Sequence, residues 1–463
     1  MKGLEVSEVR LSELERTSRI DSEFYKKENL NIQKVLEKLD SKLLTDFVHV
    51  SDGNHMSISD NFCEKGVPYY RGQDIHDFFI ENANPICIPE SFFKMPTMSR
   101  SHLQKNDVLL SIVGTIGEVS LVNTNANATC SCKLAILRPK ANCNAETIAL
   151  FLQSKYGQNQ IKKFIRGAVQ MGFILEDVNQ INIPNFSNDF QQKIESLVKS
   201  AHEKLSRSKL LYAQAEDTLL CELGLKDWQP KNEAVSIKTF SDFASSGRLD
   251  AEYYQSKYDE LFEKLSKFPQ IKIKDITNYP VSSGSTPKAG DSEYYSDEKT
   301  GIPFLRAVDI IQSRIDLNDL MYIKSRVHNG LLKRTQLHKG DVLFSIAGTV
   351  GRCGIFDYDF EANINQAIAI LRFDESVVKH LYVVQFFNSK VGQLVIEKYA
   401  RQGLQTNLNL EELSNLPIPI LPQEIQKQIA ELIQTSFALR QESKQLLEEA
   451  KTMVEHEIEK GDE

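Results

Sequence analysis

Seven cysteines and nine histidines are the side chains of this chain that could bind a transition metal. Cys130 and Cys132 form a Cys-x-Cys pair, but the sequence holds no Cys-x-x-Cys pair and no His-Glu-x-x-His cluster. Zinc sites are built from closely spaced pairs of such ligands. The spacing therefore predicts reduced, mostly buried thiols and no bound metal.

Catalytic motifs are the second place to look for chemistry. The sequence contains no Gly-x-x-x-x-Gly-Lys-[Ser/Thr] phosphate loop, no Gly-x-Ser-x-Gly nucleophile turn and no Asn-Pro-Pro-aromatic motif of an amino-methyltransferase. Paired carboxylates such as Glu448 and Glu449 occur in helical charge faces, where solvation explains them. We therefore expect a chain that is not an enzyme, with a solitary nuclease domain as the catalytic alternative.

The elements that must position any functional side chains are revealed by an internal duplication. Matched phrases recur in the same order, at an offset that moves only from 229 residues (Arg19 to Arg248) to 235 residues (Arg166 to Arg401). The phrases are Arg19-Ile-Asp-Ser-Glu-Phe-Tyr25 and Arg248-Leu-Asp-Ala-Glu-Tyr-Tyr254; Gly66-Val-Pro-Tyr-Tyr-Arg-Gly-Gln-Asp-Ile75 and Gly301-Ile-Pro-Phe-Leu-Arg-Ala-Val-Asp-Ile310; Asp107-Val-Leu-Leu-Ser-Ile-Val-Gly-Thr-Ile-Gly117 and Asp341-Val-Leu-Phe-Ser-Ile-Ala-Gly-Thr-Val-Gly351; Ala135-Ile-Leu-Arg138 and Ala369-Ile-Leu-Arg372; and Ser154-Lys-Tyr-Gly-Gln158 and Ser389-Lys-Val-Gly-Gln393. Two colinear copies of this length indicate a tandem domain duplication rather than a solenoid.

Each copy has the same expected layout. Short strands come first, including buried strands at 108–113 and 342–347 that end in Gly-Thr-x-Gly turns. Helices around 145–166 and 377–401 follow, and each copy closes with a long amphipathic helix. We therefore predict an α+β protein with two tandem mixed α/β domains separated by long antiparallel coiled-coil helices, with pseudo-two-fold symmetry.

The long helices are expected over about 188–223 and from Pro422 to Gly461. Their apolar residues follow a coiled-coil spacing, which predicts that the two helices pair with each other. The residues predicted to pair are Ile194, Leu197, Ala201, Leu211, Ala215, Ile429, Leu432, Leu439, Leu446 and Ala450. Ser208 and Ser443, at matching polar positions, are expected to help set the register. The alternative is that each helix packs only on its own domain.

The composition of the chain does not decide what kind of molecule the protein binds. The chain is 41% hydrophobic and 25% charged, and its net charge of −8 argues mildly against nucleic acid, although a basic face can coexist with acidic flanks. No apolar run is long enough to span a bilayer, and Met1–Arg10 has no secretory signal pattern, so we expect a cytoplasmic protein without a membrane partner. Two similar heads joined by a helical spacer match duplex DNA with two half-sites at a fixed separation. Because the copies have diverged, the two half-sites should differ.

The duplicated phrases Arg-[Ile/Leu]-Asp-x-Glu-[Phe/Tyr]-Tyr, Gly-[Ile/Val]-Pro-[Phe/Tyr]-x-Arg-x-x-Asp-Ile and Asp-Val-Leu-x-Ser-Ile-x-Gly-Thr-[Ile/Val]-Gly resemble those of type I restriction-modification specificity subunits. Leu223-Gly-Leu-Lys-Asp-Trp-Gln-Pro230 also resembles the linker of that family. The resemblance covers the full length. It implies a target recognition domain at 1–186, a conserved helix and linker at 187–230, a second recognition domain at 231–420 and a second conserved helix at 421–463.

By the same resemblance, the partners are double-stranded DNA, two adenine-methylating modification subunits and a motor-nuclease restriction subunit. The chain itself would hold no cofactor, whereas S-adenosylmethionine, ATP and Mg²⁺ are expected in the partner subunits. The second copy has the family-like loop Ser282-Ser-Gly-Ser-Thr-Pro-Lys288, but the first has Ser51-Asp-Gly-Asn-His55, which departs from it.

Loop side chains that could reach base edges or phosphates are the candidate DNA contacts. They are Asn54, Arg71, Gln73, Lys133, Arg166 and Gln170 in the first copy, and Ser285, Thr286, Lys288, Arg306, Gln366, Arg401 and Gln405 in the second. Arg71 and Arg306 recur in both copies and could instead serve the shared scaffold. Arg166 and Arg401 could instead cap helices. Lys133 aligns with Ala367 of the second copy. Because this position differs between the copies, Lys133 is a better candidate for specificity.

The sequence leaves two other functions open. A scaffold that assembles other proteins through its duplicated heads, without DNA binding, is favoured slightly by the acidic balance. A complex that only methylates DNA is the third interpretation, since the nuclease would be another chain.

Overall fold

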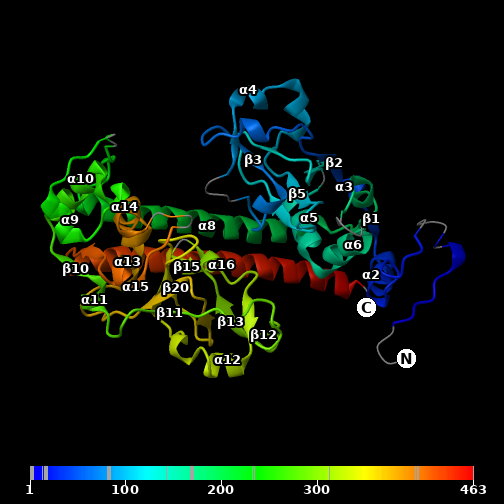
Figure 1. The fold of residues 1–463 in the computed structure, drawn as a ribbon. Coiled ribbons are helices and arrows are strands. Elements are labelled where there is room, and N and C mark those ends of the chain that lie inside the picture. The colour runs from blue at the N-terminus through cyan, green and yellow to red at the C-terminus, as the bar shows by residue number, and fades with distance from the viewer. Residues whose placement is uncertain are drawn as a thin grey trace. The chain divides into compact units, whose positions relative to one another are not determined.

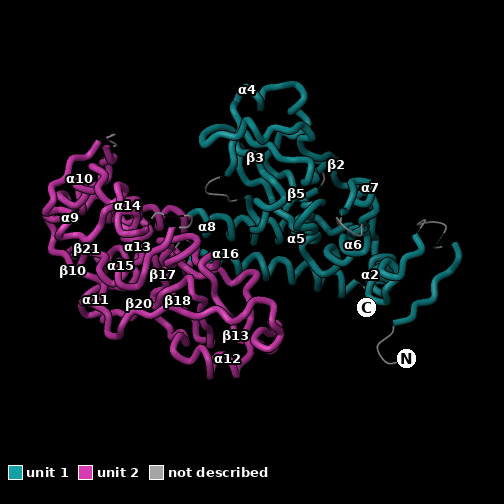
Figure 2. The backbone as a smooth tube through the Cα atoms, viewed as in Figure 1, with its two compact units in different colours: residues 1–206, 439–463 teal, residues 207–438 magenta. Residues whose placement is uncertain are grey.

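The computed structural model describes residues 5–12, 14, 19–80, 85–141, 143–166, 172–231, 233, 235–311, 313–401, 403 and 406–461. The chain forms two compact units, which Figure 2 shows in different colours. Unit 1 comprises residues 1–206 and 439–463, and unit 2 comprises residues 207–438. Each unit therefore contains one head together with a segment of each of two long helices, α8 (Asn188–Glu222) and α16 (Gln423–Lys460).

The head of unit 1 is built on an antiparallel four-stranded sheet with the order β2-β8-β5-β6. Its strands are β2 (Val48–Asp52), β5 (Val108–Ser111), β6 (Val119–Leu121) and β8 (Leu134–Pro139). A second sheet has the order β4-β3-β7, and β1 pairs with β9. Their bounds are β1 (Ser41–Leu43), β3 (Val67–Tyr70), β4 (Cys87–Ile88), β7 (Thr129–Cys130) and β9 (Asn182–Pro184). The helices of this head, labelled in Figure 1, are α2 (Lys27–Lys38), α3 (Leu44–Phe47), α4 (Glu90–Phe93), α5 (Ala145–Gln153), α6 (Lys155–Phe164) and α7 (Leu175–Val178).

Unit 2 repeats the topology of the main sheet and has a larger second sheet. Its main sheet has the order β11-β20-β17-β18, and a second sheet has the order β12-β16-β13-β19. The strands are β10 (Gln270–Lys272), β11 (Ser282–Ser283), β12 (Tyr295–Ser296), β13 (Ile302–Leu305), β14 (Ile310–Ile311), β15 (Arg314–Ile315), β16 (Met321–Ile323), β17 (Asp341–Ser345), β18 (Cys353–Phe356), β19 (Asn363–Ile364), β20 (Ile368–Leu371) and β21 (Pro417–Pro419). The helices are α9 (Phe240–Ser246), α10 (Ser256–Leu265), α11 (Ile273–Ile276), α12 (Ser325–Asn329), α13 (His380–Asn388), α14 (Lys390–Tyr399) and α15 (Leu410–Ser414). The parallel pair β13–β19 corresponds to the parallel pair β3–β7, as a duplication requires.

The repeated Asp and Arg of the strand phrases form a buried ion pair in each head. Arg138 donates from Nε and Nη2 to Asp107, at 2.8 Å for both bonds, and Arg372 donates to Asp341 at 2.7 and 2.8 Å. The carboxylates are 1% and 4% exposed. A buried carboxylate needs a charged, hydrogen-bonded partner, which explains why both residues are retained in both copies.

The Ser-Lys-x-Gly-Gln phrase joins two consecutive helices to the Gly-Thr-x-Gly turn. The Ser154 hydroxyl caps α6 by accepting from Gly157 N, and a Cβ atom on Gly157 would lie 2.2 Å from Phe151 O. Gln158 then donates to Gly117 O at 2.8 Å, at a glycine with a φ of +98°. In unit 2, Gln393 makes the equivalent bond to Gly351 O at 2.9 Å. These glycines form turns, as the sequence predicts.

Segments of α8 and α16 pack together in each unit. In unit 1, Ile194 and Val198 of α8 belong to the same apolar core as Ala450 and Val454 of α16. In unit 2, Ala215 and Leu219 share a core with Ile429 and Ile433. The first part of α8 therefore packs against the last part of α16, and the last part of α8 packs against the first part of α16. The two helices are antiparallel (Figure 1).

Among the residues predicted to pair, those that are buried are Ile194, Ala201, Leu211, Ala215, Ile429 and Ala450, and those that are half-buried are Leu197, Leu432, Leu439 and Leu446. Ser208 and Ser443 are both buried, and the hydrogen-bond partner of Ser208 is Ser436. The predicted fold class, α+β with two mixed heads and long antiparallel helices, is confirmed. Over the part of the chain that the structure describes, every helix is too short or too polar to cross a membrane.

Candidate nucleic-acid interface

Four of the residues predicted to contact DNA in the second head lie on two adjoining loops. Ser285, Thr286 and Lys288 follow β11 and are exposed, and Gln366, between β19 and β20, is also exposed. Gln366 N donates to Thr286 Oγ1 at 3.3 Å, which joins the two loops. Gly284 permits this approach, since a Cβ atom there would lie 2.2 Å from Ile364 O. The result is an exposed cluster of hydroxyl, amide and ammonium groups.

The equivalent loop of the first head is held differently. Asn54 is only 3% exposed, and its side chain is bonded within the loop, donating to Met56 O and accepting from Met56 N, both at 3.0 Å. Gly53 again allows close contact, because a Cβ atom would lie 2.3 Å from Ser131 O. Asn54 therefore shapes this loop, while Lys133 on the adjoining segment is exposed.

A buried carboxylate in the same loop positions two exposed cationic or polar groups. Asp52 is 6% exposed, and it pairs with His55 and with Arg100. The side chains of His55 and Arg100 are 61% and 56% exposed. The sequence prediction did not include these two residues. The signal that could have found them is an Asp at the end of a strand with a His three residues later, in the loop that departs from its counterpart.

The repeated arginines Arg71 and Arg306 each clamp a short turn. Arg71 donates from Nε and Nη2 to Asp74 at 2.9 and 3.0 Å, and Arg306 bonds Asp309 in the same way at 3.2 and 2.9 Å. These hydrogen bonds raise the pKa of both arginines. Their donors are largely used within the protein, so the geometry favours a scaffold role over base reading.

Each arginine clamp encloses an exposed side chain that differs between the heads. Gln73 lies between Arg71 and Asp74 and is exposed, and its counterpart Val308 is 53% exposed. An amide and an isopropyl group at the same place on the same turn present different chemistry to a partner. Gln73 is thus an exposed position that varies between the heads, on a turn whose arginine clamp does not vary.

Arg166 and Arg401 occupy equivalent positions after α6 and α14. Arg166 forms an ion pair with Asp177, and Arg401 pairs with Glu412. Burial raises the pKa of Asp177, and the nearby Arg166 charge opposes that effect. The arginine side chains remain 46% and 66% exposed, which leaves part of each guanidinium accessible. Gln170 and Gln405 lie outside the described residues.

The first repeated phrase forms a clamp of its own. Arg248 pairs with Asp250 and donates to Tyr399 O at 3.1 Å at the end of α14, and Tyr254 Oη donates to Arg248 O at 2.8 Å. In unit 1, Arg19 pairs with Asp21 in the same way. This clamp ties the start of the second head to a helix.

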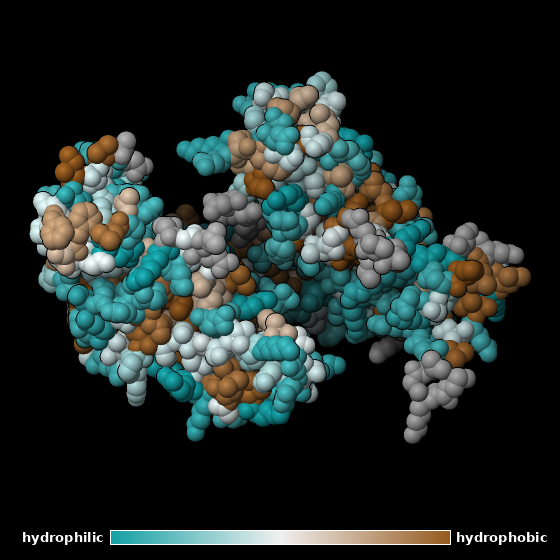
Figure 3. All heavy atoms as spheres, in the orientation of Figure 1, coloured by the Kyte–Doolittle hydropathy of each residue, from teal (hydrophilic) through white to brown (hydrophobic). Residues whose placement is uncertain are grey.

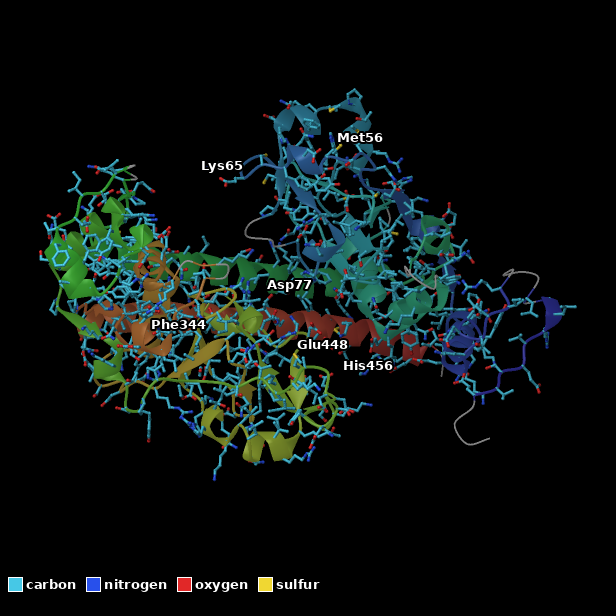
Figure 4. The ribbon with its side chains drawn as sticks, viewed as in Figure 1. Met56, Lys65, Asp77, Phe344, Glu448 and His456 are labelled. Atoms are coloured by element: carbon cyan, nitrogen blue, oxygen red, sulfur yellow. The ribbon has the colours of Figure 1, made fainter. Side chains whose placement is uncertain are left out.

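On the face shown in Figure 3, hydrophilic side chains are interspersed with small apolar patches. The exposed Lys65, in the loop before β3, projects outward from the first head (Figure 4). Within the described ranges, no three His, Cys, Asp or Glu side chains are grouped to hold a metal ion. All seven cysteines are free thiols, and burial raises the pKa of Cys130 and Cys353.

Comparison with known proteins identifies the family. The sequence profile of the type I restriction modification DNA specificity domain matches residues 37–210 and 266–451, one range in each copy of the duplication. The chain is 25% identical over 321 residues to the type I restriction enzyme EcoBI specificity subunit of Escherichia coli, covering 67% of this chain and 65% of that protein. The chain thus spans just under two thirds of the length of that relative.

Solved structures that align with this chain include the type I restriction-modification system S subunit from M. genitalium, at 13% identity and a TM-score of 0.38, covering 89% of this chain and 92% of that one. The HsdS subunit from Thermoanaerobacter tengcongensis aligns at 14% identity and a TM-score of 0.30, covering 90% and 95%. The resemblance predicted from the duplicated phrases is confirmed by the profile match, which spans well over half of the sequence. This chain belongs to the type I restriction modification DNA specificity family.

Proposed function

We propose that this chain is the DNA-reading specificity subunit of a type I restriction-modification complex. Each head binds one half of a bipartite, asymmetric site. The paired helices α8 and α16 dock the methyltransferase subunits and fix the spacing between the half-sites. The chain itself is non-catalytic and works in the cytoplasm.

The observation that most supports this function is that the two heads share one scaffold but carry different exposed residues on it. Ion pairs, helix caps and glycine turns are equivalent in both heads, whereas the exposed Gln73 and Lys133 of the first head correspond to the apolar Val308 and Ala367 of the second. Direct readout of bases depends on the identity of such side chains, while phosphate contacts only position the protein. Two different sets predict two different half-sites.

The proposed partners follow from the family to which the chain belongs. Two modification subunits supply adenine methylation with S-adenosylmethionine, and a restriction subunit supplies cleavage with ATP and Mg²⁺. A complex that only methylates uses this chain in the same way, because cleavage belongs to another polypeptide.

Methylation mapping tests the proposal. The chain is expressed with its modification partner in a host without other adenine methyltransferases, and genomic DNA is sequenced with detection of methyladenine. We expect a split asymmetric motif with a methylated adenine in each half. Exchanging the exposed loop residues of one head should alter one half of the motif only.

Two outcomes would overturn the proposal. A continuous palindromic motif would contradict two independent readers. The absence of any motif that depends on this chain, together with stable binding of partner proteins, would support the assembly scaffold instead. The net charge of −8 is the observation that favours the scaffold.

A further inference from the structure

Arg100 is an exposed arginine that a buried carboxylate of the first head holds. It lies in the short helical segment Pro96–Ser101, which packs beside β2. Asp52, the last residue of β2, is 6% exposed and forms ion pairs with Arg100 and with His55. The Arg100 side chain is 56% exposed. One part of its guanidinium is therefore fixed within the protein, while the rest of the side chain faces solvent.

The ion pair leaves donors of Arg100 available to a partner. Among the described contacts, this guanidinium uses Nη2 in its ion pair with Asp52. Arg71, in contrast, donates to Asp74 from both Nε and Nη2. Guanine accepts two N–H donors at O6 and N7 in the major groove, and an arginine that offers both donors makes the commonest specific contact between protein and DNA. Arg100 is thus better suited to that contact than Arg71.

The second head lacks the carboxylate that holds Arg100. Asp52 pairs with Ala135 across the main sheet of the first head, and Ser283 pairs with Ala369 across that of the second. Ala135 and Ala369 are the same residue of the duplicated strand phrase. Ser283 therefore stands where the first head has Asp52, and a serine hydroxyl cannot supply a negative charge.

The arginine itself is present in both heads. Arg334 corresponds to Arg100, and His102 O and Gln336 O, each two residues further along, accept hydrogen bonds from the repeated arginines of the buried ion pairs. Arg334 is exposed and takes part in none of the described ion pairs. The two heads thus carry the same arginine, held by a carboxylate in the first head only.

The loop after β2 joins Arg100 to a second exposed cation. Cys132 N donates to Asn54 O at 2.9 Å, which links this loop to the segment that carries the exposed Lys133. Arg100 is linked to the start of the same loop through Asp52. A local group of cations can attract the phosphates of DNA although the whole chain has a net charge of −8.

Reading a base and contacting a phosphate make different demands on an arginine. Base reading needs a guanidinium in one orientation, and a carboxylate that fixes the group in advance reduces the entropy lost on binding. A phosphate contact positions the protein without distinguishing sequences, so it gains less from such a hold. The ion pair with Asp52 therefore favours base reading by Arg100, and Arg334 lacks this feature.

We infer that Arg100 reads a guanine in the half-site bound by the first head, and that Asp52 is the residue that positions its guanidinium. The inference rests on the proposed function and names the base that this arginine recognises. The second head, where Ser283 replaces the carboxylate, does not read guanine through Arg334.

Selection of bound sequences from randomised DNA duplexes tests the inference, with the chain assembled with its modification partner. Arg100→Lys keeps a cation beside Asp52 but loses the planar fork that offers two N–H groups to one base. We expect the preference for guanine at one base pair of one half-site to fall at least about fivefold, with the other half-site unchanged. Arg334→Lys is the matched control in the second head and should leave the base preferences of both half-sites unchanged.

Asp52→Ser, which installs the residue of the second copy, tests the positioning role. It should lower the preference for guanine at the same base pair as Arg100→Lys does. In the Arg100→Lys background it should cause no further loss at that base pair, because the two residues act through one contact. Circular dichroism of each variant checks that it is folded. Uniformly weaker binding of all sequences by folded Asp52→Ser, without a change in base preference, would contradict the positioning role.

The outcomes separate this inference from the proposed function. If the unmodified complex selects a split motif and Arg100→Lys leaves every guanine preference in it unchanged, the inference is overturned and the proposed function stands. An equal loss of guanine preference in Arg334→Lys would also overturn the inference, since the carboxylate would then make no difference. If the unmodified complex selects no split motif, both are overturned.

Discussion

Ser436 on α16 is hydrogen bonded to Ser208 on α8 through both its side chain and the main chain. The two hydroxyl oxygens are 3.0 Å apart, and Ser436 Oγ donates to Ser208 O at 2.8 Å. Because Ser436 has one hydroxyl proton, the Ser208 hydroxyl must donate in return to Ser436 Oγ. Both residues are 3% exposed, so this polar pair lies inside an otherwise apolar helix contact of unit 2.

Removing one hydroxyl of this pair should destabilise unit 2. Ser436→Ala leaves the Ser208 hydroxyl buried without its acceptor, at a cost of about 1–2 kcal/mol. Thermal unfolding followed by circular dichroism measures the loss. Ser443→Ala is the matched control, because Ser443 is also buried on α16 but has no hydrogen bond to α8 among the described contacts. Equal losses in both variants would contradict a specific role for the pair.

The Arg372–Asp341 pair predicts a much larger effect. Arg372→Met keeps the length of the side chain but leaves the Asp341 carboxylate, which is 4% exposed, without its cation. Breaking a buried pair in this way costs about 3–5 kcal/mol. Lys427→Met provides the control, since Lys427 and Glu431 form an exposed pair on α16 whose loss should cost less than about 1 kcal/mol. Urea denaturation of both variants measures the two losses of unfolding free energy and shows whether that of Arg372→Met is the larger.

Buried His328 predicts that unit 2 loses stability in mild acid. Burial lowers the pKa of this imidazole from its ordinary value of 6.5, against the opposing charge of Glu361. The unfolded chain takes up a proton near pH 6.5, while the folded chain does so only at lower pH. Protonation therefore favours unfolding as the pH falls below 6.5, and this loss is complete below the lowered pKa.

The stability of the unmodified chain and of His328→Gln should be compared by urea denaturation at several pH values between about 7 and 5. The variant should be less stable near pH 7, because the imidazole contact with Asn363 at 3.3 Å is lost. The free energy of unfolding of the variant should also fall less steeply as the pH decreases. An unchanged slope would indicate that other groups cause the pH dependence.

The exposed loops of the second head predict two distinguishable effects on DNA binding. Gln366→Ala should relax preference at one base pair, with a loss of about 1–3 kcal/mol in discrimination, if its amide reads a base edge. Lys288→Ala should weaken binding to all sequences alike, if its ammonium contacts a phosphate. The slope of the logarithm of affinity against the logarithm of salt concentration should then become shallower by about one. Binding of randomised duplexes by the assembled complex, at two salt concentrations, measures both quantities. Identical behaviour of the two variants would contradict these roles.

The sequence predicts the duplication, the class of fold and the repeated turns well, because each depends on local patterns that occur twice. The Gly-Thr-x-Gly phrase predicts a turn, and Gly117 and Gly351 have the positive φ angles that such turns need. The axial register of α8 against α16 could not be predicted in this way. An apolar stripe fixes which face of a helix is buried, but several offsets bury it equally well, and the partner of Ser208 proves to be Ser436.

The candidate site was less predictable for a related reason. Arg71 and Arg306 have the side chains of DNA contacts, but the sequence does not show that Asp74 and Asp309 engage their guanidinium groups. The burial of Asn54 depends on how closely Gly53 approaches Ser131, which is a tertiary contact. Residue type indicates what a side chain can bind, and only the fold shows whether its donors and acceptors are still accessible.

The clamp formed by Arg71 and Asp74 has an evolutionary consequence. It keeps the backbone around Gln73 in place by bonds that do not involve the Gln73 side chain, so selection can exchange that side chain at little cost to folding. Val308 illustrates such an exchange on the same turn of the sister domain. A lineage of this protein could therefore acquire new preferences by single substitutions, without first having to recover lost stability.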